Sequence, residues 1–463
     1  MSMNLPSQND LENIHRNVLR VLEQVGLKVE NEALLVALAG VGAQIEAPRQ
    51  IARFPRPVVE EFLSACPKVN GRNRRPNLLV RASIYEGKYL DPHTNEIGGL
   101  TPGIVERYLR LARTLPNINA TFITGCPWGP SAELEPLYER FYCWKYGADP
   151  SGILYPATQA PRLLDLYQAY AQLKARPVRE VFTGGVFLMS PLRFSAEEAA
   201  QFVWWWSRGF RVSISNMTTA GLTGPVTPAG VVTVHLAEAI AIALLRKACY
   251  GETQLSLMAM LAPVDVRTMM RPYGRPEMAI ANLLFAQMAG YYGFSCFLHS
   301  GASDAKRPSC EAGAQKTMTT LSALLAGADA MIDAGLLGED CVYSPIQMIL
   351  DNDLAGALQR FLRPYDCSDE AIGFEAIAEA GPGGLFIGLG HTAERFREEL
   401  WEPSIWNREP LGAWDGRVDV ERALAAYDTL TAEASELNFL TPEEETALRA
   451  IIESGGERGK TTS

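Results

Sequence analysis

The stretch that decides the fold is residues 294–334, which read FSCFLHSGASDAKRPSCEAGAQKTMTTLSALLAGADAMIDA. Two short apolar runs, at residues 294–298 and 330–334, have the length and composition of buried strands. Between them, residues 310–326 carry a helical pattern. Because a crossover of this length joins parallel strands, the stretch predicts one β-α-β unit of a parallel sheet.

The same alternation extends from this unit in both directions along the chain. Helical patterns separate further apolar runs of strand length, and a last helical pattern lies at residues 392–400. These further runs are residues 120–125, 152–155, 181–188, 211–215, 254–260 and 385–387, which brings the predicted strands to eight. Because eight strand–helix units in series close into a barrel, we expect an α/β fold with a (β/α)8 TIM-type barrel over residues 116–402.

Two flanking regions are predicted outside the barrel. Residues 1–115 combine helical spacing at 11–25 with β-forming and turn residues at 78–100. This combination indicates an N-terminal α/β cap region made of helices and a β-hairpin. Residues 403–463 are predicted to form a C-terminal helical extension and tail. The helices predicted in this extension are residues 419–436 and 441–453.

Composition and charge narrow the class of protein. Hydrophobic residues make up 47% of the chain and charged residues 21%, which is ordinary for a globular protein. The net charge of −11 comes without clusters of Lys and Arg, which argues against a nucleic-acid partner. Residues 1–10 are polar and lack a signal-peptide core, and no apolar run approaches the ~20 residues of a membrane span. We therefore expect a cytoplasmic protein without a membrane partner.

Cysteine and histidine spacing bears on redox state and on metals. The eight cysteines are scattered without a Cys-x-x-Cys pair, which favours a reducing compartment. The five histidines show no metal-ligand spacing, so we expect no metal bound by this chain. The chain contains neither a phosphate-binding P-loop nor a Gly-x-Ser-x-Gly motif, which argues against the simplest nucleotide hydrolases and serine hydrolases.

Glycine-rich loops follow several of the predicted strands. Such loops lie at residues 125–130, 216–230, 299–306, 335–338, 381–384 and 388–392. Glycine is used where the backbone takes a positive φ or approaches another group closely. Because active sites of such barrels lie on the loops after the strands, many loops of this kind indicate a wide mouth that accepts a large partner. The alternative is that these loops simply need turn residues.

Ordered segments in these loops and helices carry a resemblance to a known family. They are residues 220–230, 237–238, 303–306, 311–314, 325–329, 334–337, 351–353, 360–361, 381–384 and 390–392. The chain resembles the trimethylamine methyltransferase family in these segments, from about residue 11 to past residue 401. The resemblance implies a (β/α)8 barrel that demethylates a methylamine and methylates cob(I)alamin on a separate corrinoid protein. It also implies a role in methanogenesis or one-carbon metabolism.

One departure from the family pattern bears on the substrate. The founding members of the family use pyrrolysine in the region that here reads residues 299–306, where this chain has standard residues only. In this it resembles the family members of the glycine-betaine type. A quaternary ammonium leaves as a neutral amine, so its methyl group is already activated, and the protein need only position it and strip water from it. We therefore expect a quaternary, betaine-type amine as methyl donor.

The candidate binding residues are aromatic side chains near the predicted strand ends. A quaternary ammonium is usually held by aromatic faces and sometimes by a carboxylate. The candidates for this role are Trp128, Tyr155, Phe187, Phe297, Tyr343 and Phe386. The alternative for each of them is ordinary core or helix packing.

Charged and polar side chains complete the predicted site. Asp304 and Glu238 are candidates for offsetting the positive charge of the substrate, and with His299 they form the candidate catalytic set. A betaine carboxylate needs a donor, and His299, Lys306 and His391 are the candidates. The alternatives are that Glu238 is a buried partner of a neighbouring group, that Asp304 orders its loop, and that the histidines are structural.

The acceptor and the assembly state follow from the family resemblance. Asp91-Pro92-His93 is similar in part to the motif by which corrinoid proteins ligate cobalt, but the glycines that follow come too late, and we interpret it as a turn. The corrinoid is therefore expected on a partner protein, and the chain itself as a homo-oligomer. Two alternatives stay open, namely a non-catalytic barrel that binds quaternary amines as a sensor or scaffold, and methyl transfer to a folate or a thiol.

Overall fold

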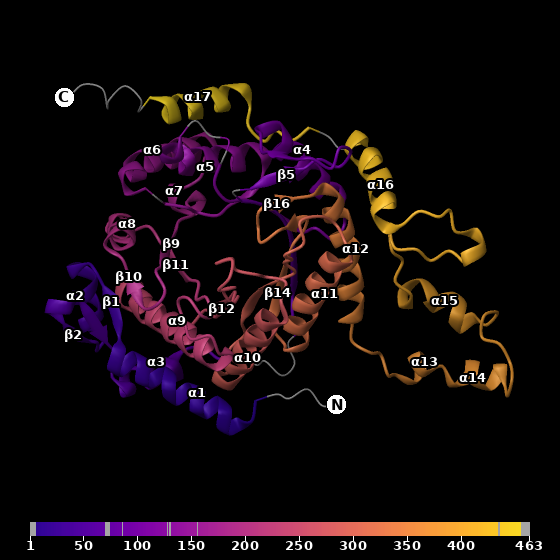
Figure 1. The fold of residues 1–463 in the computed structure, drawn as a ribbon, viewed down its shortest axis with the longest axis horizontal. Helices are drawn as coiled ribbons and strands as arrows, with labels where there is room; N and C mark the ends of the chain where they lie inside the picture. Colours follow the sequence, from indigo (N-terminus) through magenta and orange to yellow (C-terminus); the bar gives the residue numbers. More distant parts are fainter. Residues whose placement is uncertain are drawn as a thin grey trace.

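A curled parallel sheet surrounded by helices forms the body of the protein (Figure 1). The computed structural model describes residues 6–69, 75–85, 87–126, 128, 131–154, 156–433 and 436–454. The helices that cover the outer side of the strands are α4 (Pro102–Thr114), α5 (Glu135–Tyr146), α6 (Ala160–Leu173), α7 (Val178–Val181), α8 (Ala196–Trp206), α9 (Pro228–Tyr250), α10 (Pro276–Tyr292), α11 (Cys310–Leu325) and α12 (Pro345–Phe361).

Six strands pair in parallel in the order β12-β13-β14-β4-β7-β8. Their bounds are β12 Met258–Ala259, β13 Phe297–Ser300, β14 Asp329–Asp333, β4 Leu78–Ile84, β7 Ala120–Ile123 and β8 Asp149–Pro150. The strand β14, late in the chain, lies beside β4, the first strand of this sheet in the chain. The sheet therefore curls back toward its own beginning.

Two further parallel strands continue the curl. β9 (Gly185–Leu188) pairs with β11 (Ser213–Asn216), and a bridge between Ile153 and Gly185 links β9 to the chain just after β8. Between β11 and β12 the described residues form no strand ladder, and a single bridge between Ala220 and Pro263 joins the loops that follow. The observed fold is thus an α/β fold with a curled parallel sheet. Complete closure into a barrel stays a prediction.

The structure corrects the predicted first and last strands of the parallel sheet. Residues 385–387, predicted as the eighth strand, form no strand, and Leu385 and Ile387 are 79% and 82% exposed. Glycines flank this apolar run, and no neighbouring strand lies beside it to pair with, so it stays a turn. The missing strand is β4, which lies within the region predicted as the cap. The turn residues that follow it within residues 78–100 made the segment resemble part of a β-hairpin.

The N-terminal elements pack on one side of the body. α1 (Gln8–Arg20) begins with a capping box between Ser7 and Asp10, and α2 (Glu32–Gly40) is capped by Asn31. Both helices pack against α9. A small sheet, in the order β10-β1-β3-β2, joins this region to the body. Its strands are β1 (Leu27–Val29), β2 (Gln44–Glu46), β3 (Ile51–Arg53) and β10 (Arg193–Phe194).

The long helix α9 is a core element of this body. Among the described residues it is the one helix long and apolar enough to cross a membrane, with a mean hydropathy of 1.8 over its most apolar window. However, 72% of that window is buried inside the protein, where α1, α2 and α10 cover the helix. Burial by protein explains its apolar composition, because a helix that is apolar all round suits the interior of a large domain.

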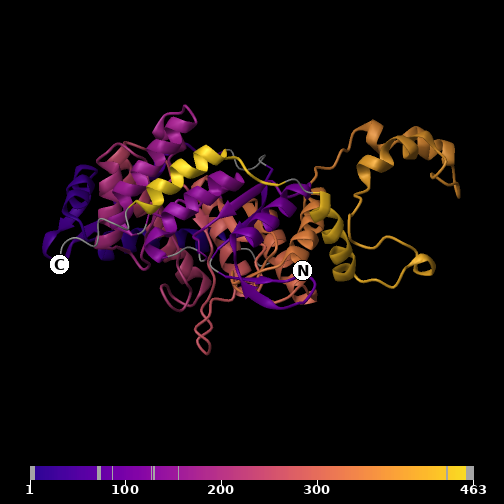
Figure 2. The ribbon, with the colours of Figure 1, turned by 90° about the horizontal axis from the view of Figure 1, so that it is seen from above.

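After α12 the chain leaves the body as an arm, which we define as residues 363–418. It carries the short helices α13 (Asp369–Ile372), α14 (Phe374–Ala380) and α15 (Gly390–Glu399), which stand away from the body (Figure 2). Residues 404–406 return to α12, where their backbone N–H groups donate to Asp353. The chain then returns through the two predicted C-terminal helices, which are present. These helices are α16 (Asp419–Glu433), which packs on α12 and α4, and α17 (Pro442–Glu453), which packs on α6 and α5.

Candidate functional site

A cavity of about 690 Å³ occupies the inside of the curled sheet. Side chains alternate between the two faces of a strand, so on β9 the buried Val186 and Leu188 face the helices. Phe187, between them, faces the cavity and is 56% exposed. The serines that line the cavity from β11, Ser213 and Ser215, are small. The interior is therefore an open cavity, whereas the interior of a typical barrel is filled by branched side chains.

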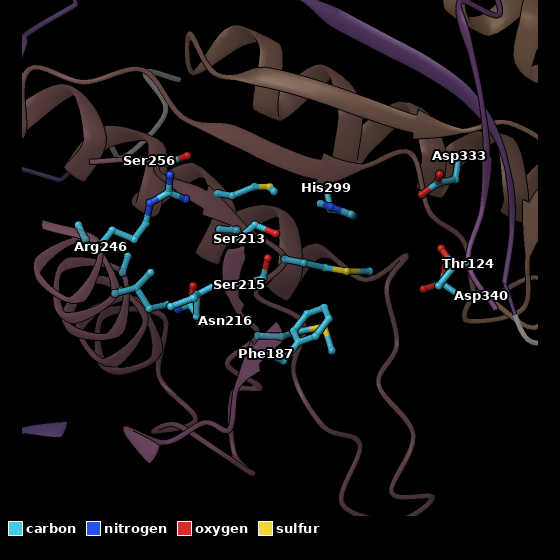
Figure 3. Close-up of a pocket in the computed structure, with 18 of the residues that line it drawn as sticks. Thr124, Phe187, Ser213, Ser215, Asn216, Arg246, Ser256, His299, Asp333 and Asp340 are labelled. Atoms are coloured by element: carbon cyan, nitrogen blue, oxygen red, sulfur yellow. The ribbon is translucent and has the colours of Figure 1, made fainter. Parts of the chain in front are cut away.

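The charged side chains divide the cavity into two ends. Figure 3 shows Asp333 and Asp340 at one end, Arg246 at the other, and His299 between them. Glu252 binds Arg246 through both its Nε and Nη2 atoms, and it also pairs with Arg211 at 2.7 Å. Two N–H groups of Arg246 are therefore already engaged, although Glu252 shares its single negative charge between two arginines. The other polar groups labelled at that end are neutral. They are Ser213, Ser215, Asn216 and Ser256.

Of the two acids, Asp333 is the one whose carboxylate has hydrogen-bond and charge partners. Its Oδ1 atom accepts hydrogen bonds from Arg81 Nε at 2.7 Å and from the Ser83 hydroxyl. Burial alone would raise the pKa of Asp333, but the charge and hydrogen bond of Arg81 outweigh it, so the pKa is lowered. Arg81 also lies over the ring of Phe122, at 4.4 Å from its centroid. This network holds the Asp333 carboxylate ionised and electrically matched.

Asp340, in contrast, has a carboxyl group without such partners among the described residues. It lies in a turn with a φ of +65°, its half-buried carboxyl lines the cavity, and among the described residues no hydrogen bond or ion pair to it is found. Burial, together with the nearby Asp333, raises the pKa of Asp340 to about 7, although Arg271, Lys316 and Arg81 act against this. An acid in this state binds a cation favourably, because the cation replaces the missing water and charge partner.

His299 is uncharged at neutral pH. Its side chain is half-buried in the cavity wall, and burial, helped by the charge of Arg81, lowers its pKa to about 4 despite the nearby Asp333. A neutral imidazole can accept or donate a hydrogen bond. It cannot supply the positive charge that a bound carboxylate prefers.

Aromatic rings and thioethers make up much of the remaining wall. Tyr85 and Tyr273 line the cavity near the acids, whereas Phe187 lies nearer Ser215 and Asn216 (Figure 3). Burial raises the pKa of Tyr273 to about 12, so its hydroxyl stays protonated. The thioethers are those of Met217, Met258 and Met260. Aromatic faces beside an unpaired carboxylate are the combination that attracts a quaternary ammonium. The cavity can therefore hold a methylated cation.

Two of the predicted site residues line this cavity, namely His299 and Phe187. Asp304 does not line it, and its carboxylate instead accepts backbone hydrogen bonds from Tyr273 at 2.7 Å and Gly274 at 3.1 Å. Asp304 therefore positions the loop that carries Tyr273. The exposed Lys306 donates to the carbonyl of Asp304 at 2.9 Å and pairs with Glu339 at 3.2 Å.

Glu238 is fully buried in α9 and hydrogen-bonded by neutral groups. Its carboxylate accepts from Ser190 Oγ at 2.9 Å, Leu192 N at 2.9 Å, Asn216 Nδ2 at 3.0 Å and Thr218 Oγ1 at 2.9 Å. Glu238 is not among the residues that line the cavity, but Asn216 is. The carboxylate thus orients one cavity-lining amide from behind.

The remaining predicted residues lie elsewhere. Trp128 packs against Tyr142, and the ring of Phe297 stands 6.1 Å from that of His299 without lining the cavity. Tyr343 is fully buried, and its hydroxyl accepts the backbone N–H of Tyr85. Phe386 and His391 lie in the arm, away from the cavity, and Tyr155 falls outside the described residues.

The cavity residues that sequence reasoning missed are Tyr85, Tyr273, Asp333 and Asp340. One signal was present for Asp333, since an acid at the carboxyl end of a predicted apolar strand faces the active-site side of such a fold. Tyr85 follows β4, which was placed in the cap region, so its position could not be recognised. Within the described ranges, no group of three or more His, Cys, Asp and Glu side chains could hold a metal ion.

Comparisons with known proteins agree with the resemblance. The sequence model of the trimethylamine methyltransferase family matches residues 155–457. The glycine betaine methyltransferase of Desulfitobacterium hafniense strain Y51 is 24% identical over 482 residues, which cover 99% of this chain and 97% of that protein. The trimethylamine methyltransferase of Methanosarcina barkeri is 22% identical over 92% of this chain and 90% of that protein. The monomethylamine methyltransferase structure from Methanosarcina barkeri aligns with a TM-score of 0.41 at 8% identity, over 98% and 93% of the two chains.

Proposed function

The chain belongs to the trimethylamine methyltransferase family, and from that premise we propose that it moves a methyl group from a quaternary, betaine-type amine to the cob(I)alamin of a separate corrinoid protein. Its relatives are methyltransferases of methylated amines, so methyl transfer from such an amine is the shared chemistry. The finer assignment to a quaternary amine and a corrinoid acceptor is our proposal. The observation that carries it is the open cavity with an unpaired carboxylate, Asp340, beside aromatic side chains.

Methyl transfer from a quaternary ammonium requires mainly that the protein position the methyl group. When the methyl carbon is attacked, the carbon–nitrogen bond breaks and its electron pair stays on nitrogen, which leaves as a neutral tertiary amine. No proton has to be moved, so the neutral His299 and the protonated Tyr273 suffice as wall groups. Asp340 and the aromatic faces orient the ammonium and exclude water from it. The reduced cobalt of the corrinoid, when docked, supplies the nucleophile.

The mouth of the cavity fits the approach of a partner protein. Phe187, Met217 and Met258 both line the cavity and stay 40% exposed or more, so the cavity opens to solvent at this rim. The loops that follow β11 and β12 add exposed apolar side chains, which are Leu222, Val226, Val266, Met269 and Met270. Exposed apolar side chains gathered on the loops of a mouth mark an interaction surface. We propose that the corrinoid protein docks there and that this chain itself holds neither cobalt nor another metal.

The strands support a complete (β/α)8 barrel as the finer description of the fold. Eight parallel strands follow one another around the cavity in chain order, and β14 lies beside β4. The bridge from Ala220 to Pro263 spans the seam between the loops after β11 and β12. We propose that β11 and β12 are neighbouring strands of one barrel whose ladder is open at this point. A single opening between two strands enlarges the cavity without changing the strand order.

We further propose that the chain works in the cytoplasm as a homo-oligomer. All eight cysteines are free, as expected for a reducing compartment. The arm exposes many large apolar side chains that its own body does not cover, among them Tyr365, Phe374, Leu385, Ile387 and Leu411. An exposed apolar segment of this extent favours an interface, and every copy of the chain carries the same arm.

Anaerobic mixing of the pure protein with free cob(I)alamin and one amine at a time tests the function. The panel consists of glycine betaine, proline betaine, carnitine, choline and trimethylamine. We expect methylcobalamin, recorded by its absorption spectrum, with at least one betaine. A folate and a thiol are assayed in parallel as acceptors. Tight binding of a betaine without transfer to any acceptor would instead support a sensor or scaffold, and the absence of both binding and transfer would contradict both readings.

A further inference from the structure

The loop of residues 265–275 carries three arginines in different electrostatic states. Asp265 pairs with Arg275 at 3.1 Å and with Arg267 at 3.6 Å. Arg271 has no ion pair within the described part of the chain, and its Nε and Nη2 atoms are buried without a hydrogen-bond partner. A buried guanidinium with unsatisfied donors is costly, so its position needs an explanation other than stability.

Arg271 stands directly behind the cavity wall. Its Nη1 atom lies 3.3 Å from the sulfur of Met217, and its guanidinium carbon lies 5.4 Å from the centroid of the Tyr273 ring. Met217 and Tyr273 both line the cavity, and Met217 is 40% exposed. An exposed thioether changes its rotamer easily, so a small movement of Met217 opens the guanidinium to the cavity.

Asp340 provides the opposite charge on the same cavity. Arg271 lies close enough for its charge to lower the pKa of Asp340, yet the two groups form no ion pair. Asp333 is not free for a ligand, because Arg81 already neutralises it. One anion therefore lines this end of the cavity and one cation lies behind its wall, each without a charge partner among the described residues.

Two separated opposite charges fit a ligand that carries both charges itself. A purely cationic amine would match Asp340 and leave the buried N–H groups of Arg271 unsatisfied. A zwitterion matches both, and a charge-assisted hydrogen bond from a guanidinium to a carboxylate is among the stronger contacts available in proteins. The donors suggested by sequence are less suitable, since Lys306 is paired with Glu339 and His299 is neutral.

We propose that Arg271 and Asp340 together select a zwitterionic methyl donor, with Arg271 receiving its carboxylate and Asp340 facing its quaternary ammonium. The proposal rests on the proposed function only in taking a quaternary amine as the ligand. Arg271 is thereby a specificity-determining residue, and the aromatic faces of Tyr85 and Tyr273 complete the ammonium site.

Calorimetric titration of the full-length protein with three probes tests this assignment. Glycine betaine carries both charges, choline replaces the carboxylate by a hydroxyl, and tetramethylammonium carries the ammonium alone. We expect the unmodified protein to bind glycine betaine at least about tenfold more tightly than choline. Arg271→Gln should remove this preference and change tetramethylammonium binding much less. Asp340→Asn should weaken the binding of all three probes.

Matched variants separate a ligand contact from a structural effect. Arg267→Gln, on the same loop but exposed, should leave every affinity unchanged. Arg271→Lys retains the charge and should keep the preference for betaine, which covers the case in which Arg271→Gln does not fold. Arg246→Gln tests the arginine that lines the cavity itself and should change the preference little, because two N–H groups of Arg246 are already bound by Glu252.

Three results would overturn the inference. They are equal binding of choline and glycine betaine by the unmodified protein, equal weakening of all probes by Arg271→Gln, and loss of the preference in Arg246→Gln alone. These results are independent of methyl transfer. If the preference follows Arg271 but no acceptor is methylated, the proposed function fails and the ligand class stands. If choline is the better methyl donor, methyl transfer from a quaternary amine stands, but the betaine-type substrate and the zwitterion assignment both fail.

Discussion

Arg81 on β4 and Asp333 on β14 are register partners in adjacent parallel strands, and their side chains form an ion pair of 2.7 Å between Nε and Oδ1. The two residues are 252 positions apart in the chain. This pair ties the first strand of the curled sheet to the last. Because Arg81 already neutralises Asp333, this carboxylate is not available to a ligand. Among the described residues that line the cavity, Asp340 is then the carboxyl group without an ion pair.

Breaking the Arg81–Asp333 pair should destabilise the fold. The two side chains are only 12% and 9% exposed, so Arg81→Gln leaves a nearly buried charge without its partner. We expect the free energy of unfolding to fall by about 3–5 kcal/mol, measured by urea denaturation at pH 7. Arg56→Gln, which breaks the exposed pair with Glu60, is the control and should cost less than about 1 kcal/mol. A loss in Arg81→Gln no larger than in this control would contradict the argument.

Ligand binding should depend on pH through Asp340. Its pKa is raised to about 7, so the free protein carries the protonated acid below pH 7 and the carboxylate above it. A quaternary ammonium prefers the carboxylate, and the affinity for tetramethylammonium should therefore rise about tenfold between pH 6 and pH 8.

The other groups around the Asp340 carboxyl stay constant over this pH range. Arg271, Lys316 and Arg81 are the cations that act on Asp340. Asp333 remains ionised because its pKa is lowered, and His299 remains neutral because its pKa is about 4. Tyr273 stays protonated. In Asp340→Asn the affinity should be low and flat across the range. A slope that survives in this variant would assign the titration to another group.

Helices were predictable from sequence because their signals are local. α9 begins at Pro228 after the capping Thr227 and ends at Gly251 in the left-handed conformation, and all three residues mark helix ends by their own chemistry. The sequence carries a helical pattern near residues 228–248, and α9 extends two residues beyond it. The crossover pattern, and with it the parallel sheet, followed from such helices.

The cavity was not predictable because it depends on strand register and on long-range pairing. A shift of one residue would turn Val186 instead of Phe187 toward the cavity. Asp340 owes its position to a tight turn after β15 (Leu336–Leu337), a strand too short to recognise in the sequence. Arg271 was not predicted because it differs from the other two arginines of its loop only in its pairing. Asp265 forms ion pairs with Arg267 and Arg275 but not with Arg271, and the sequence does not show which arginine stays unpaired.

The arm should control the assembly state. Leu385 and Ile387 are among the most exposed apolar side chains of the arm, and neither contributes to the folded body. If the arm packs against a second copy, the double substitution Leu385→Asp and Ile387→Asp should shift the protein to monomers in light scattering coupled to size-exclusion chromatography. Glu375→Gln, on the exposed α14 of the same arm, is the control and should leave the mass unchanged. An unchanged oligomer in the double variant would exclude this face as the interface.

Phe187 should contribute to binding through the charge of the ligand and not through its shape alone. Its ring faces the cavity and is 56% exposed, so Phe187→Ala removes an aromatic face with little loss of core packing. A cation–π contact at a partly open site is worth about 0.5–2 kcal/mol, and we expect glycine betaine to bind about two- to thirtyfold more weakly to the variant. The carbon isostere 3,3-dimethylbutyrate has the same shape and carboxylate but no positive charge. It should bind weakly to both proteins, and the substitution should change its affinity much less, because only the area of contact is lost. Phe187→Leu keeps an apolar side chain without a ring and should behave like Phe187→Ala toward betaine. Equal losses for betaine and its isostere would mean that the ring acts as a hydrophobic wall, and the ammonium would then depend on Asp340 and the two tyrosines.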